Sequence, residues 1–572
     1  MKEFLEKNYR IIAAVLLLFL FAQAITSIKN KSITIDEISH LSSGYSYIKT
    51  GDFRLNVEAL PLVDMISALP LLILNPKLPL DHPSWKNAEL FEYEGQYHWE
   101  FGNQFFFYYN NNPEQLLFFG RIPVMLLSVL LGFFVFKWAK EIYGIMAGLF
   151  ALFLYSFEPN ILAHSGLATI DLGSSFFVFI ALYYFWRFLK NISIKSLVIA
   201  GITLGLAELS KFTALYLIPI YFVLAFIFLY ARKNEMALKK LITDKKTCTL
   251  FGLLFVILII AFFVVLAGFF FTGFPAYILG LKYIAWHTNA GHPAYLFGQH
   301  SMNGWWYYYI AAFFIKTPIP LLIFLVLSLV FFNKPKGKDI AAELFLAVPV
   351  IALIVFSFFN HINIGLRHIL PIYPFIFVFV SKIINLKVKK QGILNFAFIA
   401  LCLWYLAGSL VIYPHYLAYF NEAVGGPDNG YKYLLDSNLD WGQDLKGLKI
   451  YMDKHGIKNI TLGYWGKDSP ERIGIRYKQV NCYPEPGLIA VSANTLYGLR
   501  EDRSHCLEWL QKYKPIDKIG YSIFIYNITD KIDVELERAN FCKKGCITGC
   551  AEVNAKYGRS YFANDSCQCE CK

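Results

Sequence analysis

The chain has 572 residues, of which 56% are hydrophobic and only 16% are charged. Soluble proteins carry about 25% charged residues, so this balance argues against a wholly soluble protein and favours one that crosses a membrane several times. The net charge of +12 does not indicate nucleic-acid binding, because the lysines and arginines form short clusters between apolar runs rather than one patch.

Apolar runs of about 20 residues predict membrane-spanning helices. Eleven such runs lie near 11–28, 116–136, 145–162, 168–186, 196–210, 213–231, 249–271, 306–332, 340–359, 369–386 and 391–413. Basic clusters, which usually face the cytoplasm, lie at 2–10, 137–140, 187–195, 232–246, 334–338 and 382–390. The pattern predicts a multi-pass cell-membrane protein with a cytoplasmic N-terminus, and with everything after about residue 414 outside.

The first apolar run has a second interpretation. A basic start, an apolar middle and the sequence Ala22-Gln23-Ala24 are also typical of a cleaved signal peptide. We prefer a retained helix, because it would hold the neighbouring acids Asp36 and Glu37 just outside the membrane. All twelve histidines lie on the predicted outer side, which indicates chemistry at that face.

The first outer segment, 29–115, is long for a loop. Its apolar stretch 59–74 is interrupted by Pro61 and Pro70, so it predicts short helices lying at the membrane interface. Two further outer loops are predicted at 272–305 and 360–368.

From residue 414 the composition becomes that of a soluble protein. Helical spacing occurs at 440–456 and 494–513, and strand-like runs occur at 459–466, 487–494 and 518–529. Alternating helices and strands predict a small outer α/β domain. The predicted division is therefore a transmembrane domain 1–413, an outer domain 414–540 and a cysteine-rich tail 541–572.

The outer part holds eight of the ten cysteines. They are Cys482, Cys506, Cys542, Cys546, Cys550, Cys567, Cys569 and Cys571. An even number in an oxidising compartment favours disulfides over a zinc site, although eight cysteines allow 105 pairings. Cys248 and Cys402 lie in the membrane part and are predicted to be inert.

Asp36 and Glu37 directly follow the first apolar run. Carboxylates close to lipid are costly unless they are paired or functional, although Lys29 and Lys31 would also suit an ordinary solvated loop. Their position at the outer face makes them candidate catalytic residues.

Cations also gather at the predicted outer ends of helices. Arg367 can bind a phosphate with two parallel hydrogen bonds and His368 can add a third donor, although an arginine there can also simply snorkel to the interface. Lys211 and Lys316 lie at outer ends where topology does not call for a cation, and the further candidates His164 and Asp171 stand at an outer turn into a helix. This arrangement indicates transfer of a group from a lipid phosphate, with a carboxylate as base and cations stabilising the phosphate.

Several longer stretches carry a family resemblance. They are "DEISHLSSGYSYIKTGDFRLN", "AHSGLATIDLGSSFFVFIALYYFWRF", "SKFTALYLIP", "GWWYYYIAAFFIKTPIPLL", "NIGLRHILPIYPF" and "HYLAYFNEAVGGPDNGYKYLLDSNLDWGQDL", spread over about residues 30–450. In these stretches the chain resembles the GT-C-fold glycosyltransferases of the protein O-mannosyltransferase and aminoarabinose-transferase superfamily.

The resemblance implies an inverting transferase. Its donor would be a polyprenyl-phosphate sugar, carrying mannose or a similar hexose or pentose, and its acceptor a hydroxyl of a protein Ser/Thr, a lipid or a glycan. Asp36 would be the catalytic acid of the family, with Glu37 beside it, and Arg367 and His368 would lie on the phosphate side.

One motif departs from the family pattern. Relatives often read N-x-E-H-P-P-L where this chain has "NVEALPL", so Glu58, a further candidate for substrate binding, is kept while Ala59 and Leu60 differ. Asp64 stands where relatives often have lysine. Some relatives bind a divalent ion near this loop, and the resemblance leaves a possible divalent metal ion open here.

Two other functional classes remain open. A transporter or flippase of lipid-linked sugars would share the outer cations, but it would place polar residues at the bilayer midplane, where these runs are apolar. A membrane-anchored binding protein with its function in 414–572 would leave eleven spans and the outer cations unexplained.

Overall fold

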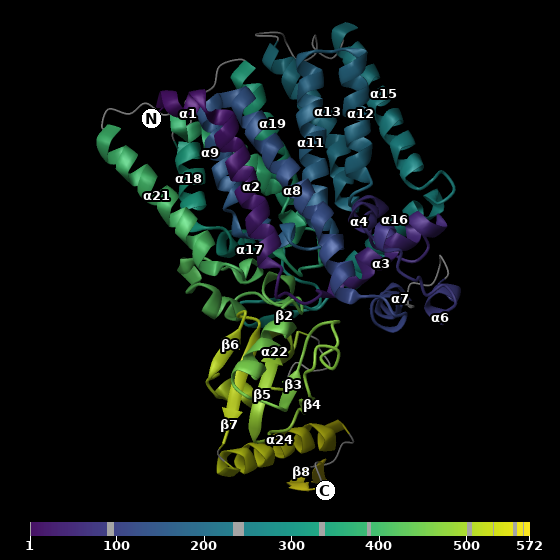
Figure 1. The fold of residues 1–572 in the computed structure, drawn as a ribbon, viewed down its shortest axis with the longest axis vertical. Helices are drawn as coiled ribbons and strands as arrows, with labels where there is room; N and C mark the ends of the chain where they lie inside the picture. The colour runs from purple at the N-terminus through teal and green to yellow at the C-terminus, as the bar shows by residue number, and fades with distance from the viewer. Residues whose placement is uncertain are drawn as a thin grey trace.

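The protein is described by a computed structural model over residues 2–88, 97–232, 245–330, 338–385, 391–499, 506–529, 531–552, 557–563 and 566–571. A broad helical bundle forms one end of the molecule, a small α/β domain lies beneath it, and the C-terminal tail lies at the far tip (Figure 1). This confirms the predicted fold class of a helical membrane part with a small C-terminal α/β domain, and its place outside the membrane stays a prediction. The boundaries at 413 and 540 stay a prediction.

All eleven predicted apolar runs lie on helices. In chain order the helices of the bundle are α1 (Lys2–Lys7), α2 (Tyr9–Ser27), α8 (Pro113–Tyr143), α9 (Ile145–Ser156), α10 (Pro159–Ser165), α11 (Ile170–Lys190), α12 (Ile194–Glu208), α13 (Leu217–Arg232), α15 (Lys245–Gly268), α17 (Tyr308–Lys316), α18 (Ile319–Val330), α19 (Lys338–Ser357), α20 (Ile372–Val380) and α21 (Gln391–Ile412). Short 3-10 helices at Phe212–Tyr216, Leu366–Ile369 and Ser381–Asn385 extend or join them.

The number of spans is smaller by a strict criterion. In the described part of the chain, six helices are long and apolar enough to cross a membrane, or eight if each of two bent pairs counts as one span. The pair α9 and α10 bends by 64°, and the pair α17 and α18 by 110°. The predicted number of eleven therefore stays a prediction, and the basic clusters at 232–246 and 334–338 lie mostly outside the described residues.

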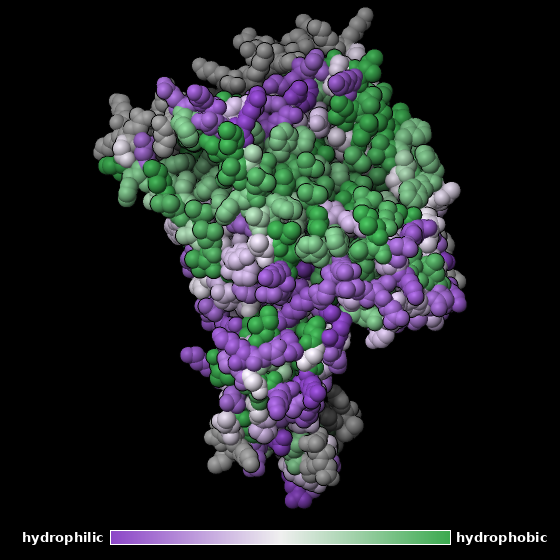
Figure 2. All heavy atoms as spheres, viewed as in Figure 1, coloured by the Kyte–Doolittle hydropathy of each residue, from purple (hydrophilic) through white to green (hydrophobic). Residues whose placement is uncertain are grey.

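A band of apolar side chains surrounds the bundle on the face shown in Figure 2, with hydrophilic residues above and below it. Large apolar side chains on α15 and α21, such as Phe255, Leu403 and Val411, are exposed. Exposed apolar area on this scale marks a surface that meets lipid. The protein is an integral membrane protein.

Close packing of α12 against α15 depends on glycine. A Cβ built on Gly201 would lie 2.7 Å from Ile260 Cβ, and one on Gly205 would lie 2.6 Å from Val264 Cβ. Small residues let helix backbones approach within a membrane, where there is no hydrophobic force between helices. In contrast, α11 is apolar and buried on nearly every face, so it forms the centre of the bundle.

The first outer segment folds as short helices against the end of the bundle. They are α3 (Ile35–Thr50), α4 (Pro61–Ala68), α5 (Leu71–Leu74), α6 (Pro83–Lys86) and α7 (Tyr97–Asn103), followed by a π-helix at Gln104–Tyr108. α4 begins at Pro61 and Pro70 caps α5, as the interrupted apolar stretch predicts. Gly51 ends α3 in the left-handed conformation, with φ of 69°.

The second outer segment contains α16 (Phe274–Ala290) and a hairpin of β1 (Ala294–Leu296) and β2 (Gln299–Ser301). Beyond the bundle, single-turn 3-10 helices at Tyr416–Ala418, Glu422–Val424, Pro427–Lys432 and Asp436–Asn438 lead into the outer domain.

The outer domain is built on a mixed five-stranded sheet in the order β4-β3-β5-β7-β6. β3 (Ile460–Gly463) is parallel to β4 (Tyr477–Gln479) and β5 (Gly487–Ser492), whereas β7 (Ile523–Ile528) is antiparallel to β5 and β6 (Asp517–Ile519). The predicted strands at 459–466 and 487–494 and the helix α22 (Leu445–Lys454) are confirmed, whereas the run 518–529 forms the end of β6, a turn and β7.

The predicted helix at 494–513 is wrong as a continuous element. Only α23 (Ala493–Leu496) and a 3-10 turn at Leu510–Lys512 form, and 500–505 lie outside the described residues. Gly498 adopts a positive φ of 60°, which ends α23, and a disulfide ties Cys506 to Cys482.

The tail is a helix clamped to a hairpin by disulfides. α24 (Lys531–Glu552) presents cysteines at successive turns to the hairpin of β8 (Tyr557–Ala563) and β9 (Ser566–Cys571). The pairs are Cys542–Cys567, Cys546–Cys569 and Cys550–Cys571. Disulfides rather than zinc are therefore confirmed, and Cys248 and Cys402 are free as predicted.

Candidate active site

A cavity of about 550 Å³ opens where the first and second outer segments meet the bundle. Six of the predicted site residues line it: Asp36, Glu58, Asp171, Lys211, Arg367 and His368. Its inner walls are apolar and come from the bundle, and include Leu215, Tyr216, Leu353 and Phe356. The cavity thus joins a charged zone to an apolar zone.

Four charged side chains alternate in sign along one side of the cavity. Arg367 Nη1 lies 2.6 Å from Asp36 Oδ2 and 3.7 Å from Asp171 Oδ2. Lys211 Nζ lies 2.7 Å from the other oxygen, Oδ1, of Asp171. Asp171 is in the first turn of α11, where the helix dipole also favours a carboxylate. The two carboxylates balance the charges of Arg367 and Lys211. The cluster therefore keeps two cations at the cavity wall without carrying a net charge.

Two buried nitrogens at this cluster are suited to binding an anion. Arg367 Nε and His368 Nε2 have no hydrogen-bond partner among the described residues. A buried donor without an acceptor costs about 1–3 kcal/mol. Trp441, from the outer domain, covers the guanidinium at 4.3 Å from ring centroid to Cζ. The oxygens of a bound oxyanion would satisfy both nitrogens.

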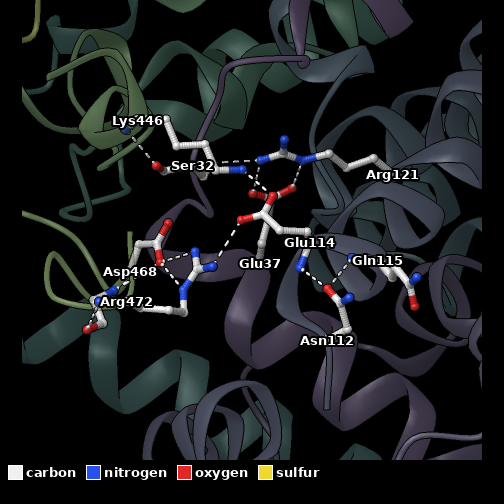
Figure 3. Close-up of polar contacts among 10 residues, drawn as sticks. Ser32, Glu37, Asn112, Glu114, Gln115, Arg121, Lys446, Asp468 and Arg472 are labelled. Atoms are coloured by element: carbon white, nitrogen blue, oxygen red, sulfur yellow. Dashed lines mark hydrogen bonds and ion pairs between the residues drawn. The ribbon is translucent and has the colours of Figure 1, made fainter. Parts of the chain in front are cut away.

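Glu37 does not line the cavity. Its two carboxylate oxygens each lie 2.7 Å from an Arg121 nitrogen (Figure 3). Backbone amides of Thr34 and Ala168 also donate to them at 2.9 Å. Burial raises the pKa of Glu37, but the guanidinium and these amides outweigh burial and hold the pKa below its ordinary value. With every acceptor occupied, Glu37 is placed to hold α3 rather than to touch a substrate.

The start of α3 is also tied to the outer domain. The amide of Ser32 donates to Gln443 O at 2.9 Å, the amide of Ile35 donates to Trp441 O at 3.1 Å, and Lys31 pairs with Asp444. Nearby, Lys446 and Arg472 of the outer domain pair with Glu114 at the start of α8 (Figure 3). The outer domain therefore fixes where α3 begins, one residue before Asp36.

Two other predicted site residues also lie outside the cavity wall. Lys316 Nζ donates to the backbone oxygens of Leu417 at 2.7 Å and Asn438 at 2.5 Å, so its charge is used inside the fold. His164 is buried with its ring centroid 6.2 Å from that of Trp441. Their predicted substrate roles have no support from the geometry.

A carboxylate and several imidazoles form the opposite wall. Glu58 accepts a hydrogen bond of 2.6 Å from Tyr283 and lies 3.9 Å from His98 Nε2. Burial lowers the pKa of His98, His287 and His292, so these rings are neutral at pH 7. Within the described ranges, no group of three or more His, Cys, Asp or Glu side chains is arranged to hold a metal ion.

Sequence reasoning missed His40, His98 and His287, which line the cavity. His40 follows Asp36 by four residues, so the spacing i, i+4 on one helix was the available signal. His98 and His287 come from separate segments, and nothing local to either one places it at this site.

The amino-acid sequence of residues 114–264 matches the family model described as dolichyl-phosphate-mannose-protein mannosyltransferase. Over this segment the chain is similar to that family. The segment runs from α8 to α15 and carries Asp171 and Lys211 of the cavity. The resemblance to this superfamily is therefore confirmed, whereas none of the curated proteins matches the chain.

Several solved structures are similar to the chain in fold. ArnT from Cupriavidus metallidurans bound to undecaprenyl phosphate is 11% identical, with 90% of this chain and 97% of that chain covered and a TM-score of 0.46. The oligosaccharyltransferase of Archaeoglobus fulgidus in its apo form is 12% identical, covering 88% and 73%, with a TM-score of 0.42. The S. cerevisiae Pmt1-Pmt2 complex bound to the sugar donor is 20% identical, covering 47% and 34%, with a TM-score of 0.33.

Proposed function

We propose that the protein is an inverting membrane glycosyltransferase. It moves a sugar, mannose or a similar hexose or pentose, from a polyprenyl-phosphate donor to an acceptor hydroxyl on the outer face of the membrane. The observation that carries this proposal is one cavity that joins an apolar wall to two cations and a carboxylate. The family match over residues 114–264 supports the same donor class.

Each wall of the cavity has a role in this reaction. The apolar wall at Leu353 and Phe356 takes the first isoprene units, and Arg367 and Lys211 stabilise the phosphate as it leaves. Asp36 accepts the proton of the acceptor hydroxyl as that oxygen attacks the anomeric carbon. Glu58, with the imidazoles beside it, offers acceptors and a neutral polar surface to sugar hydroxyls.

The test is a transfer assay with the full chain in proteoliposomes. Radiolabelled polyprenyl-phosphate mannose, and other polyprenyl-phosphate sugars, are supplied with peptide, lipid or glycan acceptors, and the labelled product is identified by mass spectrometry. We expect a new glycosidic product together with free polyprenyl phosphate. Label that crosses the bilayer while it stays on the lipid phosphate would instead show a flippase.

The variant Arg367→Lys tests whether Arg367 binds the donor phosphate. Lysine keeps the charge but cannot make two parallel bonds, and a charge-assisted hydrogen bond contributes about 1.5–3 kcal/mol. We expect kcat/KM for the donor to fall roughly ten- to a hundredfold. Arg54→Lys is the matched control, because Arg54 pairs with Asp52 outside the cavity. A lysine variant equal to wild type at every donor concentration would remove Arg367 from the site.

The proposed orientation has the N-terminus in the cytoplasm and the outer domain outside. His300 on β2 and Ile194 at the start of α12 are both exposed and lie on opposite predicted sides. With Cys248 and Cys402 replaced by serine and the disulfides intact, a cysteine at 300 should react with an impermeant maleimide in intact cells. A cysteine at 194 should react only after permeabilisation, and the reverse pattern would invert the topology.

A further inference from the structure

A second acidic and basic pair lies behind the cavity wall near Asp36, with only its histidine lining the cavity, and the proposed roles leave it unused. His40 Nδ1 lies 2.9 Å from Asp64 Oδ1, and both side chains are almost completely buried. His40 lines the cavity and follows Asp36 by one helical turn on the same face of α3. Because Nδ1 faces Asp64, the Nε2 edge of the ring is the one left for the cavity.

Asp64 reaches His40 because α4 packs unusually close to α3. A Cβ built on Gly44 would lie 2.1 Å from the backbone oxygen of Asp64, so only glycine fits at this position. His40 is the ion-pair partner of Asp64, whose two oxygens have no hydrogen-bond partner in the described part of the chain. A fully buried carboxylate beside one imidazole is costly to keep for packing alone, since apolar residues of the same volume would pack as well.

We propose that the His40–Asp64 pair stores the proton that Asp36 takes from the acceptor hydroxyl. The inference rests on the proposed transfer reaction and deepens it. The acceptor oxygen loses its proton and bonds to the anomeric carbon, and the bond from that carbon to the phosphate oxygen breaks, leaving its electrons on the lipid phosphate. The proton passes from Asp36 to His40 Nε2, either directly or through one water, and returns to bulk water after product release.

The charges around both residues favour this second transfer. A protonated Asp36 would leave Arg367, 2.6 Å away, without its nearest counter-charge, so the proton is better held elsewhere. The charged groups that face His40 are Asp64 from α4, Asp36 from its own helix and Asp171 from α11, with His98 from α7 close by. Burial lowers the pKa of His40, but these carboxylates outweigh burial and raise it above its ordinary value.

The pair makes the pH dependence of transfer testable. His40 must be neutral to accept a proton. The rate of sugar transfer should therefore rise as the pH increases through the pKa of His40, above about pH 6.5. Asp64→Asn removes the main counter-charge, so the pH at which the transfer rate rises should move lower. The matched control is His455→Gln, an exposed histidine of the outer domain, which should leave that pH unchanged.

A second variant covers the case in which Asp64→Asn does not fold. His40→Ala should lower the transfer rate by about 10²-fold, and added imidazole should restore part of it. An unchanged pH dependence in a folded Asp64→Asn protein, or a His40→Ala protein with the wild-type rate and profile, would overturn the proposal.

The pair can also be measured without any transfer. NMR titration of histidine-labelled protein in nanodiscs should give a His40 pKa above the ordinary value, and a lower one in Asp64→Asn. A His40 pKa that Asp64→Asn leaves unchanged would overturn the inference even if the protein transfers sugar. A wild-type protein that transfers no sugar, with the titration as expected, would contradict the proposed function instead.

Discussion

Asp36→Asn should lower the rate of sugar transfer by about 10²–10⁴-fold, the usual loss when a general base is removed. Asparagine keeps the size of the side chain but cannot accept the proton. Arg367 would lose its 2.6 Å partner yet keep Asp171 at 3.7 Å, so the phosphate side of the cavity should stay in place and donor binding should survive. The measurement is kcat in proteoliposomes, with donor affinity measured in parallel.

A neighbouring acid provides the control for that experiment. Asp52 lies in the same outer segment, pairs with Arg54 at 3.0 Å and does not line the cavity, so Asp52→Asn should transfer sugar as wild type does. Transfer by Asp36→Asn within about threefold of wild type, at equal expression and equal monodispersity, would rule out Asp36 as the base.

Glu37→Gln should damage the fold rather than the chemistry. Removing one partner of a buried ion pair leaves an uncompensated charge and costs about 3–5 kcal/mol. Here Arg121, with 1% of its side chain exposed, would keep its charge without the carboxylate that now meets it at two nitrogens. We expect a clearly lower unfolding temperature in detergent, or protein that no longer runs as a single species.

Two variants separate this effect from a catalytic one. Glu141→Gln breaks a partly exposed pair with Arg187 and should cost less than about 1 kcal/mol. The double variant Glu37→Leu and Arg121→Met removes both charges, so it should recover much of the lost stability. A Glu37→Gln protein with wild-type stability but a much lower rate of sugar transfer would instead show that Glu37 takes part in catalysis.

The elements of the fold could be predicted well from local patterns. Each apolar run is helical because a backbone in lipid must satisfy its own hydrogen bonds, and the strands of the outer domain follow from alternation and turn residues. The prediction failed for 494–513, where helical spacing was right but Gly498 and the Cys482–Cys506 bond interrupt the helix. The number of eleven spans stays a prediction, because some of the apolar runs form helices shorter than 18 residues and two others form sharply bent pairs.

The site could be predicted only in part. Asp36, Asp171, Lys211 and Arg367 were identified from charge at the outer ends of helices, and the structure brings these four together. Glu37 and Lys316 show the same signal in the sequence. In the structure Glu37 pairs with Arg121 and Lys316 donates to a backbone oxygen, so neither charge faces the cavity. Charge near lipid signals that a residue has a partner, and it does not tell whether that partner is a side chain or a substrate.

The sequence by itself determined that this is a multi-pass membrane protein with a C-terminal α/β domain and a cysteine-rich tail, because those features depend on composition and local spacing. Only the tertiary structure decided which carboxylate faces the cavity. Asp36 and Glu37 are adjacent on α3, so they point about 100° apart, one toward Arg367 and the other toward Arg121. The rotation of α3 is set by contacts more than 400 residues away in sequence, between Ser32 and Gln443 and between Ile35 and Trp441, which no local pattern encodes.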